Sequence, residues 1–467
     1  MAKDMTQGSL LKVLVQFSLP LFLSGLLQEL YSWSDAFMVG NVEGELSLAA
    51  IGSTTPISNL IIMMITGFSL GICVLSGQLY GSGEHSELKK VLSSFSVVLS
   101  GVFLLAVIAG IIFMKPLLHL LQTPDAIFAN ASSYLLIILL GIPFLVVYNV
   151  YSAVLRGMGD SKTSFWAIVI SSLINILTDI LFVVVLRYGV IGAAVSTVIA
   201  QVLMAVFIVC YSTKKYTLMR FRIGKHCIDG KILRRGLSLS LPTAIQSSVH
   251  SVGNLTLQNF MNGFGAQTVA AITAAYRVDG VIMLPIINLG YGISTVVAQN
   301  TGAKNHQRAK RGAFVGMGVM VVVATILTVA VAPSGGNLVS MFGVTEESAA
   351  IGKTFFSIIA PFYLLFGIAT AVRSFLEGVG DVVFTGIVSI AALGVRVLLT
   401  YTLSAQYGNS IIALAEGLSW AALLLMCLIR FVWKHRKTTS AAPQFPENEM
   451  EYHGPQEAAT EVPDGQS

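Results

Sequence analysis

Twelve apolar stretches, each long enough to cross a lipid bilayer, constrain this chain more than any other feature. About 20 apolar residues span the hydrocarbon core, and within lipid only helices and closed barrels satisfy every backbone group. Of the 467 residues, 55% are hydrophobic and 11% are charged, whereas soluble domains are about a quarter charged. The stretches cover residues 13–39, 48–79, 91–114, 132–155, 163–186, 190–212, 236–261, 268–300, 312–332, 350–373, 383–404 and 410–430. We therefore expect an all-α membrane protein with twelve transmembrane helices rather than a soluble protein with a large core.

The basic residues fall mainly on one side of these stretches. If both termini share a side, 22 of the 28 Lys and Arg lie there, and only Lys115, Arg187 and Lys353 lie opposite. An excess of Lys and Arg marks cytoplasmic segments. We expect a multi-pass protein of the plasma membrane, most simply a bacterial inner membrane, with both termini in the cytoplasm. The net charge of +5 thus reports topology, and we expect no nucleic-acid partner.

The two halves of the chain repeat each other. Three motifs recur 221 residues later: GQLYGSGEHSELKK (77–90) as AQNTGAKNHQRAKR (298–311), LRGMGD (155–160) as LEGVGD (376–381), and LAAI (48–51) as VAAI (269–272). Each half contains six stretches, so both halves enter the membrane from the same side. This pattern predicts a pseudo-twofold axis along the membrane normal, with substrate bound between halves that rock to alternate access.

Composition divides the chain further. We expect an N-lobe over residues 1–212, a basic cytoplasmic linker over 213–235 and a C-lobe over 236–437. Residues 438–467 contain six acids and no Lys or Arg, which predicts a disordered acidic tail of unknown function. We expect a monomer surrounded by the lipid bilayer.

Enzymatic signatures are missing from the sequence. There is no P-loop pattern and no H-E-x-x-H motif, and the four cysteines have no paired spacing. We therefore expect no enzyme activity, no cofactor and no bound metal other than a coupling sodium ion.

Two carboxylates lie within apolar stretches of the first half. An ionised side chain at the bilayer centre costs about 3 kcal/mol or more, so Asp35 and Asp179 mark a functional site. Asn175 lies one helical turn before Asp179, and Thr197 on the next stretch could add a hydroxyl. Hard oxygen ligands suit sodium, and paired carboxylates also suit protons. The sequence leaves both ions open, together with a purely structural role for two hydrogen-bonded acids.

The repeat shows that this acidic pair belongs to the first half alone. At the offset of 221 residues, Asn175 corresponds to Arg396 and Asp179 to Thr400. Asp35 has no acidic counterpart near Gln258.

Other polar residues of the apolar stretches predict a substrate cavity. Gln28, Ser32 and Asp35 share one helical face, and His250, Asn254 and Gln258 recur every four residues. A polar stripe of this kind is typical of a wet cavity wall. The sequence does not decide the roles of three further acids, Glu29, Asp279 and Glu416.

Several motifs resemble the multidrug and toxic compound extrusion (MATE) family of secondary transporters. They are the Leu-Pro at 19–20, D-x-x-M-V-G at 35–40, LRGMGDSKTSF at 155–165, INILTD at 174–179 and VAQNTGA at 297–303. The resemblance covers residues 8–435. In the family's N-lobe ion-site (DinF-like) branch, the site residues fall on Asp35, Asn175, Asp179 and Thr197. Gln28 and Tyr134 fall near the family's central chamber, while His250 stands where another branch has a carboxylate.

The resemblance implies efflux of amphiphilic, often cationic small molecules, driven by inward flow of protons or sodium. A lipid-linked precursor flippase of the same superfamily is an alternative, although such proteins usually have fourteen spans and basic cavities. A membrane-embedded enzyme or a receptor would need a catalytic constellation or a ligand-binding domain outside the membrane, and the outer loops are short. The sequence identifies neither the substrate nor the coupling ion.

Overall fold

The computed structural model describes residues 4–220 and 227–440, and helices account for nearly all of them. The first half contains α1 (Leu10–Glu43), α2 (Glu45–Gly81), α3 (His85–Leu120), α4 (Asp125–Gly157), α5 (Ser161–Asp179) with a π-helix (Ile180–Val185), and α6 (Gly189–Lys215). After a 3-10 turn (Thr217–Met219), the second half contains α7 (Gly230–Asn262), α8 (Ala266–Gly302), α9 (His306–Ser340), α10 (Glu346–Ile359), α11 (Phe362–Gly378), α12 (Val382–Tyr407) and α13 (Ile411–Ser440). A 3-10 turn (Gly408–Ser410) joins the last two helices.

These helices form twelve spans. In the described part of the chain, nine helical stretches are long and apolar enough to cross a membrane, or ten with the bent pair α10–α11. One of the nine, Val382–Trp433, contains α12 and most of α13. The twelfth span is α7, which the polar stripe of His250, Asn254 and Gln258 makes less apolar. The twelve-helix prediction is confirmed.

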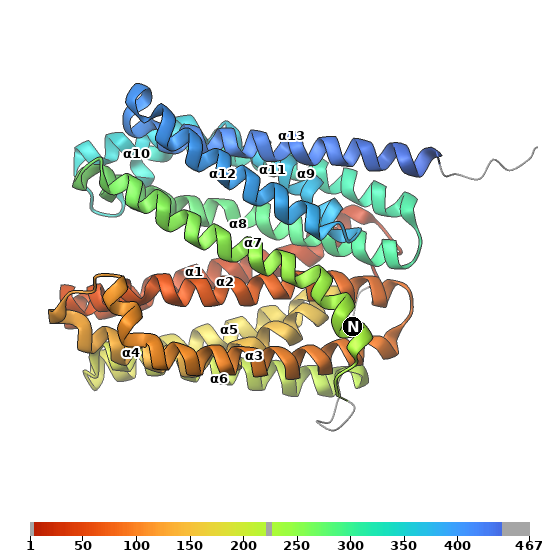
Figure 1. Cartoon of the computed structure of the whole chain (residues 1–467), viewed down its shortest axis with the longest axis horizontal. Coiled ribbons are helices and arrows are strands. Elements are labelled where there is room, and N and C mark those ends of the chain that lie inside the picture. The colour runs from red at the N-terminus through yellow and green to blue at the C-terminus, as the bar shows by residue number, and fades with distance from the viewer. Residues whose placement is uncertain (1–3, 221–226, 441–467) are drawn as a thin grey trace, which may run out of the picture.

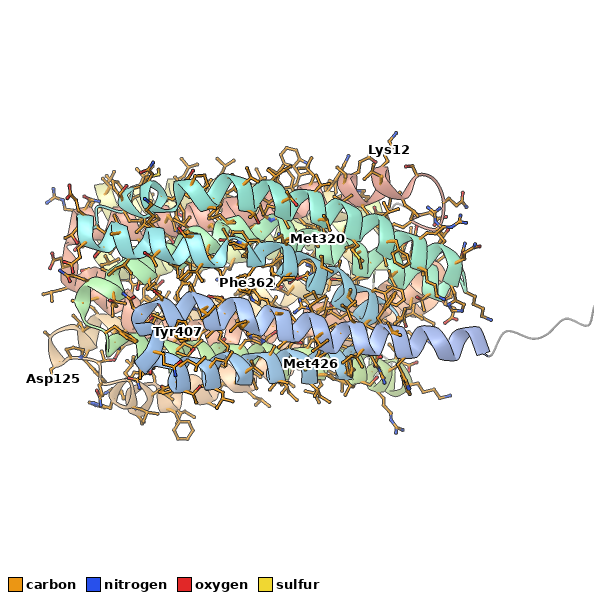
Figure 2. The ribbon with its side chains drawn as sticks, turned by 90° about the horizontal axis from the view of Figure 1, so that it is seen from above. Lys12, Asp125, Met320, Phe362, Tyr407 and Met426 are labelled. Carbon is orange, nitrogen blue, oxygen red and sulfur yellow. The ribbon has the colours of Figure 1, made fainter. Side chains whose placement is uncertain are left out.

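One predicted span is broken. The stretch predicted as 350–373 is two helices, α10 and α11, which meet at an angle of 51°. Pro361, which lacks a backbone N–H, precedes α11 directly. Phe362 at this bend lies near the middle of the bundle's length (Figure 2).

The helices form two bundles that lie side by side (Figure 1). Helices α1–α6 form one bundle and α7–α13 the other, with α1 and α2 facing α7 and α8. The first turns of α1 contribute Val13, Leu14 and Phe17 to the hydrophobic core of the second bundle. The halves are therefore in close contact along part of their interface.

We call one end of the molecule the basic end. It contains the start of α1, the end of α13 and the turns at 82–84, 158–160, 303–305 and 379–381, while Asp125 and Tyr407 lie at the opposite end (Figures 1 and 2). The helices extend into the predicted linker, because α6 continues to Lys215 and α7 starts at Gly230, with residues 221–226 outside the described part. Helix α13 extends to Ser440, and the rest of the predicted tail, residues 441–467, also lies outside it.

The two bundles lock together at the basic end through equivalent residues of the repeat. The Gln78 amide donates to the Gly378 carbonyl at 3.3 Å, and the Gln299 amide donates to the Gly157 carbonyl at 2.8 Å. Gly81 packs directly on the Gln299 carbonyl, and Gly302 packs directly on the Gln78 carbonyl. Each residue and its counterpart differ by 221 positions.

We call these contacts of Gln78 and Gln299 the glutamine lock. The lock is not fully symmetric. The Gln299 side-chain oxygen accepts from the Met5 N–H at 2.9 Å, whereas the Gln78 side-chain oxygen accepts from Arg235 at 3.4 Å. Arg308 donates to the backbone carbonyls of Met5, Gln7 and Gly8 at 2.7–3.3 Å. The segment before α1 thereby holds the fully buried Met5 side chain against this closed end.

Candidate functional site

Asp35 and Asp179 face each other from neighbouring helices. Asp35 lies on α1, Asp179 is the last residue of α5, and their carboxyl groups are close enough to interact electrostatically. Asp179 is fully buried. Directly after it the backbone widens into the π-helix Ile180–Val185, a feature found frequently at functional sites. The two acids, 144 positions apart in sequence, thus share one site.

This site has a surplus of acceptors. Asp35 Oδ1, both Asp179 carboxyl oxygens and both Asn175 amide atoms are buried without a donor or acceptor among the described residues. Two facing carboxyl groups can hydrogen-bond to each other only when a proton lies between them. A buried polar group without a partner costs about 1–3 kcal/mol, and more when it is charged. A bound cation would satisfy these oxygens.

Helix α6 adds two hydroxyl groups. Ser196 lies beside Asp179 and donates to the Gly192 carbonyl at 3.0 Å, and Thr197 donates to the Ala193 carbonyl at 3.0 Å. Each hydroxyl oxygen keeps lone pairs that can accept from water or bind a cation. Ser196 is missing from the predicted set, because nothing in the sequence separates it from its neighbour Thr197.

A cavity of about 150 Å³ adjoins the site in the first half. Gln28, Asn175 and Thr197 line it, so the predicted cavity wall and the predicted ion site share one space. Its other polar lining residues, which the sequence prediction missed, are Tyr31, Thr66, Tyr148, Asn149, Ser171, Ser172 and Gln201. Their signal was weak because single hydroxyls and amides are frequent in membrane helices.

Two further predicted cavity residues lie near this space but do not line it. Tyr134 on α4 is close enough to Asp35 and Asp179 to interact with both electrostatically. Ser32 is exposed on α1. Their roles remain predictions.

The predicted polar stripe on α7 does not line the same cavity. His250 lies against α12, next to the Ser389 backbone, and it is near Arg373 and Arg396. Asn254 is exposed, and the Gln258 amide donates to Asn262 at 3.3 Å. A substrate role for these three residues also remains a prediction.

Acids of undecided role have partners in the second half. Arg396 on α12 pairs with Glu416 on α13 at 2.8 Å and donates to the Tyr276 hydroxyl at 2.9 Å. The Tyr363 hydroxyl donates to Asp279 at 2.6 Å. Arg396, the repeat counterpart of Asn175, thus places a fixed cation where the first half has an amide. Between the halves, Glu29 on α1 interacts electrostatically with Arg277 on α8.

Comparisons with known proteins agree with this architecture. The family model MatE matches twice, over residues 20–181 and 242–402, once in each half. Probable multidrug resistance proteins YpnP and YoeA of Bacillus subtilis are 30% and 29% identical, covering 90% and 91% of this chain and 94% of each relative.

Solved transporters share the fold. An outward-facing multidrug resistance MATE family transporter has a TM-score of 0.84 and 20% identity, and a MOP superfamily transporter from Pyrococcus furiosus has a TM-score of 0.85 and 21% identity. Each comparison covers 94% of this chain and 98% of the other. With a family model matched in both halves and relatives aligned over nearly their whole length, the chain belongs to the MatE family of membrane transporters, which are not enzymes.

Proposed function

We propose that this protein exports amphiphilic, cationic small molecules by alternating access, in exchange for protons or sodium ions. The observation that carries the proposal is the Asp35–Asp179 pair, which lies beside a cavity between membrane helices and has three carboxyl oxygens that are buried without a donor among the described residues. An exchanger needs a site where an ion binds one conformation better than another. Carboxylates that meet across two helices provide such a site, because a small movement of either helix changes the distance between them.

The basic end is the cytoplasmic end in this proposal. Lys and Arg accumulate there, as the positive-inside rule requires of cytoplasmic segments. The glutamine contacts close that end, so the structure corresponds to a state that is closed toward the cytoplasm. Cysteines introduced within residues 122–130 should then react with an impermeant reagent added outside intact cells. Reaction only after the cells are opened would reverse the orientation.

Several features support cationic substrates. The two carboxylates lie next to the cavity, and the cavity itself has no Lys or Arg among its lining residues. Tyr31 and Tyr148 offer aromatic faces that can attract an organic cation. The two Bacillus relatives are described as probable multidrug resistance proteins, and the homologous MepA of Staphylococcus aureus, 24% identical, as a multidrug export protein.

The test is efflux of a cationic dye from cells or its uptake into inverted vesicles. Transport that stops with a protonophore and is unchanged without sodium would assign the proton, and the reverse would assign sodium. Dye transport that depends on neither the proton gradient nor the sodium gradient would overturn the proposed exchange.

A further inference from the structure

We propose that Arg156 forms, together with residues of both halves, a binding site for a small inorganic anion such as chloride. The site lies between the two bundles, next to the glutamine lock. This inference concerns a different site from the cation exchange proposed above and does not depend on it.

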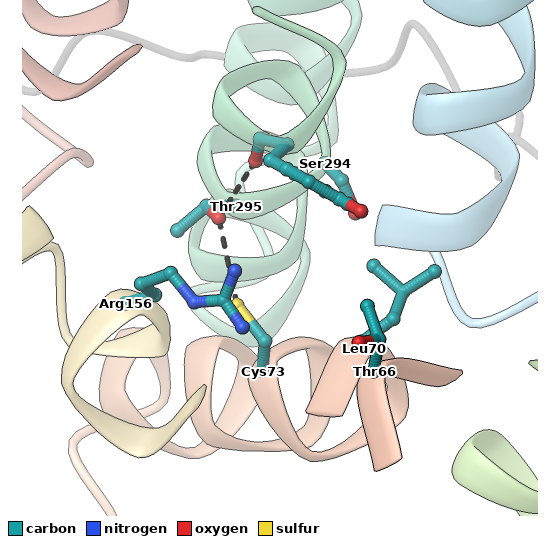
Figure 3. Close-up of a pocket in the computed structure, with 7 residues that line it drawn as sticks. Thr66, Leu70, Cys73, Arg156, Ser294 and Thr295 are labelled. Atoms are coloured by element: carbon teal, nitrogen blue, oxygen red, sulfur yellow. Dashed lines mark hydrogen bonds between the residues drawn. The ribbon is translucent and has the colours of Figure 1, made fainter. Parts of the chain in front are cut away.

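A small cavity surrounds the Arg156 side chain (Figure 3). It is lined from the first half by α2 and α4 and from the second half by α8. The lining residues are Thr66, Leu70, Cys73, Arg156, Tyr291, Ser294 and Thr295. In Figure 3 the guanidinium group points from α4 toward Cys73 and Thr295, across the interface between the halves. Any ligand held there therefore contacts both halves at once.

The guanidinium group of Arg156 has no counter-ion among the described residues. No carboxylate within the described ranges lies within 4.0 Å of it, and its Nε is buried without an acceptor. The guanidinium carbon lies 5.7 Å from the centre of the Tyr291 ring, which is uncharged. Arg156 is half-buried, and a partly desolvated charge without a counter-ion is stabilised by taking up an anion.

The second half has an acid at the position that corresponds to Arg156. The counterpart of Arg156 is Glu377, which lies 3.3 Å from Arg373 within the second half. Two other half-buried arginines also have acids: Arg396 pairs with Glu416, and Arg430 pairs with Asp381, each at 2.8 Å. These three arginines of the second half each have an acid within 4.0 Å, whereas Arg156 of the first half has none among the described residues.

The cavity wall suits an anion by its other groups as well. It contains no carboxylate, and the buried Ser294 hydroxyl has no hydrogen-bond partner within the described part of the chain. A hydroxyl can rotate to donate to an anion. The cavity volume of about 10 Å³ leaves room for roughly one water-sized ligand. That size excludes sulfate and phosphate, and among anions a monatomic one such as chloride needs the smallest adjustment of the wall.

The location predicts what the anion does. Gly157, the residue after Arg156, accepts the Gln299 hydrogen bond of the lock. An anion that contacts both halves here binds the locked state better than a state in which the halves have separated. Chloride should therefore shift the population toward the locked state.

The direct test is bromide, which replaces chloride and scatters X-rays anomalously. Crystals of the full-length protein grown or soaked in bromide should show an anomalous peak beside Arg156. Wild-type crystals alone decide this point. A wild-type site that holds only water would overturn the proposal.

Thermal stability in detergent provides an independent measurement. At constant ionic strength, replacing gluconate by chloride should raise the melting temperature of the wild type in a saturable way. Arg156→Gln should lose most of this rise in melting temperature. Ser294→Ala should need several-fold more chloride to reach half of the full rise. Arg187→Gln, which removes an exposed arginine at the opposite end, should respond like the wild type. Equal chloride responses in wild type and Arg156→Gln would contradict the site.

Discussion

In the proposed exchange, Asp35 on α1 and Asp179 on α5 bind the coupling ion together. The free-energy cost of an ionised side chain in a membrane helix marked both acids as candidate site residues. The repeat showed that only the first half has these acids. The structure adds that the two carboxyl groups meet. Sequence could not show this, because the contact depends on how α1 packs against α5.

Neutralising either acid should abolish exchange. Asp35→Asn or Asp179→Asn removes the charge that attracts the coupling ion, so gradient-driven dye efflux should fall at least about tenfold, equivalent to 1.4 kcal/mol of lost preference between states. Folding should be retained, since an amide is cheaper to bury than a carboxylate. The assay is vesicle transport under a fixed ion gradient.

The control for this experiment comes from the repeat. Thr400→Ala changes the counterpart of Asp179, whose hydroxyl only donates to the Arg396 carbonyl of its own helix at 2.7 Å. Its transport should stay near normal. Wild-type rates in both Asp→Asn proteins would show that this pair does not couple transport to the ion. Asp279 and Glu416 would then be the next candidates.

The same limit applies to the second half. Glu416 and Arg396 stand 20 positions apart, on helices whose mutual rotation the sequence does not give. The sequence places an intramembrane Arg and Glu in the same half, but it does not show that they pair with each other. Ser196 was missed for a simpler reason, because serine is common in packed membrane helices.

At the level of elements, the two G-x-G-D turns do equivalent work in both halves. Gly159 and Gly380 adopt positive φ angles of 86° and 90°, which glycine tolerates best. The aspartate that follows each glycine then holds the last helix of its own half. Asp160 bonds Lys215 at 2.9 Å and Tyr216 at 2.8 Å, and Asp381 bonds Arg430 at 2.8 Å.

Removing Asp160 should destabilise the first half. Burial alone would raise the pKa of Asp160, but hydrogen bonds from Lys215, Thr163 and Tyr216 hold this pKa below its ordinary value. Asp160→Ala leaves the Lys215 ammonium without its acid and should cost about 3 kcal/mol at neutral pH. Thermal unfolding in detergent measures the loss.

The pH dependence follows from the sign of this shift. The ionised Asp160 stabilises the folded protein above the ordinary pKa of about 3.9, and this contribution disappears as pH falls through the lower folded-state pKa. The difference in stability between the wild type and Asp160→Ala should therefore become smaller at acidic pH. Asp125→Ala, at the exposed start of α4, should change stability little at either pH. A stability difference that grows on acidification would contradict the stabilising role of the ionised Asp160.

Sequence predicted the existence of nearly every element but few of their ends. The twelve spans could be predicted from the lengths of the apolar stretches, because about 20 apolar residues are needed to cross the hydrocarbon core. It did not give the break between α10 and α11, since the surrounding residues stay apolar and a proline permits a bend without fixing its angle. The helices also continue beyond the apolar stretches, as α2 does to Gly81, because polar residues at a membrane surface can remain helical.

For the whole molecule, the predicted repeat sets the way in which the halves meet. The lock at the basic end combines two cross-half hydrogen bonds with two places where backbone touches backbone, at Gly81 and Gly302. These contacts are polar and close, so they require a tight fit rather than a large apolar area.

Adding a methyl group at either contact should open the lock. A Cβ on Gly81 or Gly302 would clash with the carbonyl of Gln299 or Gln78, and overpacking of this kind costs about 1–3 kcal/mol. Gly81→Ala and Gly302→Ala should each raise the open population about tenfold. Spin labels at the exposed positions Glu84 and Lys304 would report a longer distance.

Gly318→Ala provides the matched control, because a Cβ there meets nothing within 4 Å. It gains the same helix propensity as the other two changes and should leave the distance distribution unaltered. Equal distributions in all three variants would show that the lock does not govern closure of this end.

The reciprocal pairing of Gln78 with Gly302 and of Gln299 with Gly81 is the arrangement found in a symmetric dimer, where the same patch serves both partners. Two separate copies of one half would form both contacts at once and close without any further surface. In such an ancestor, a single substitution would have altered both hydrogen bonds together. In the fused chain each glutamine can change alone, and the two have already acquired different neighbours, Arg235 for one and Met5 for the other.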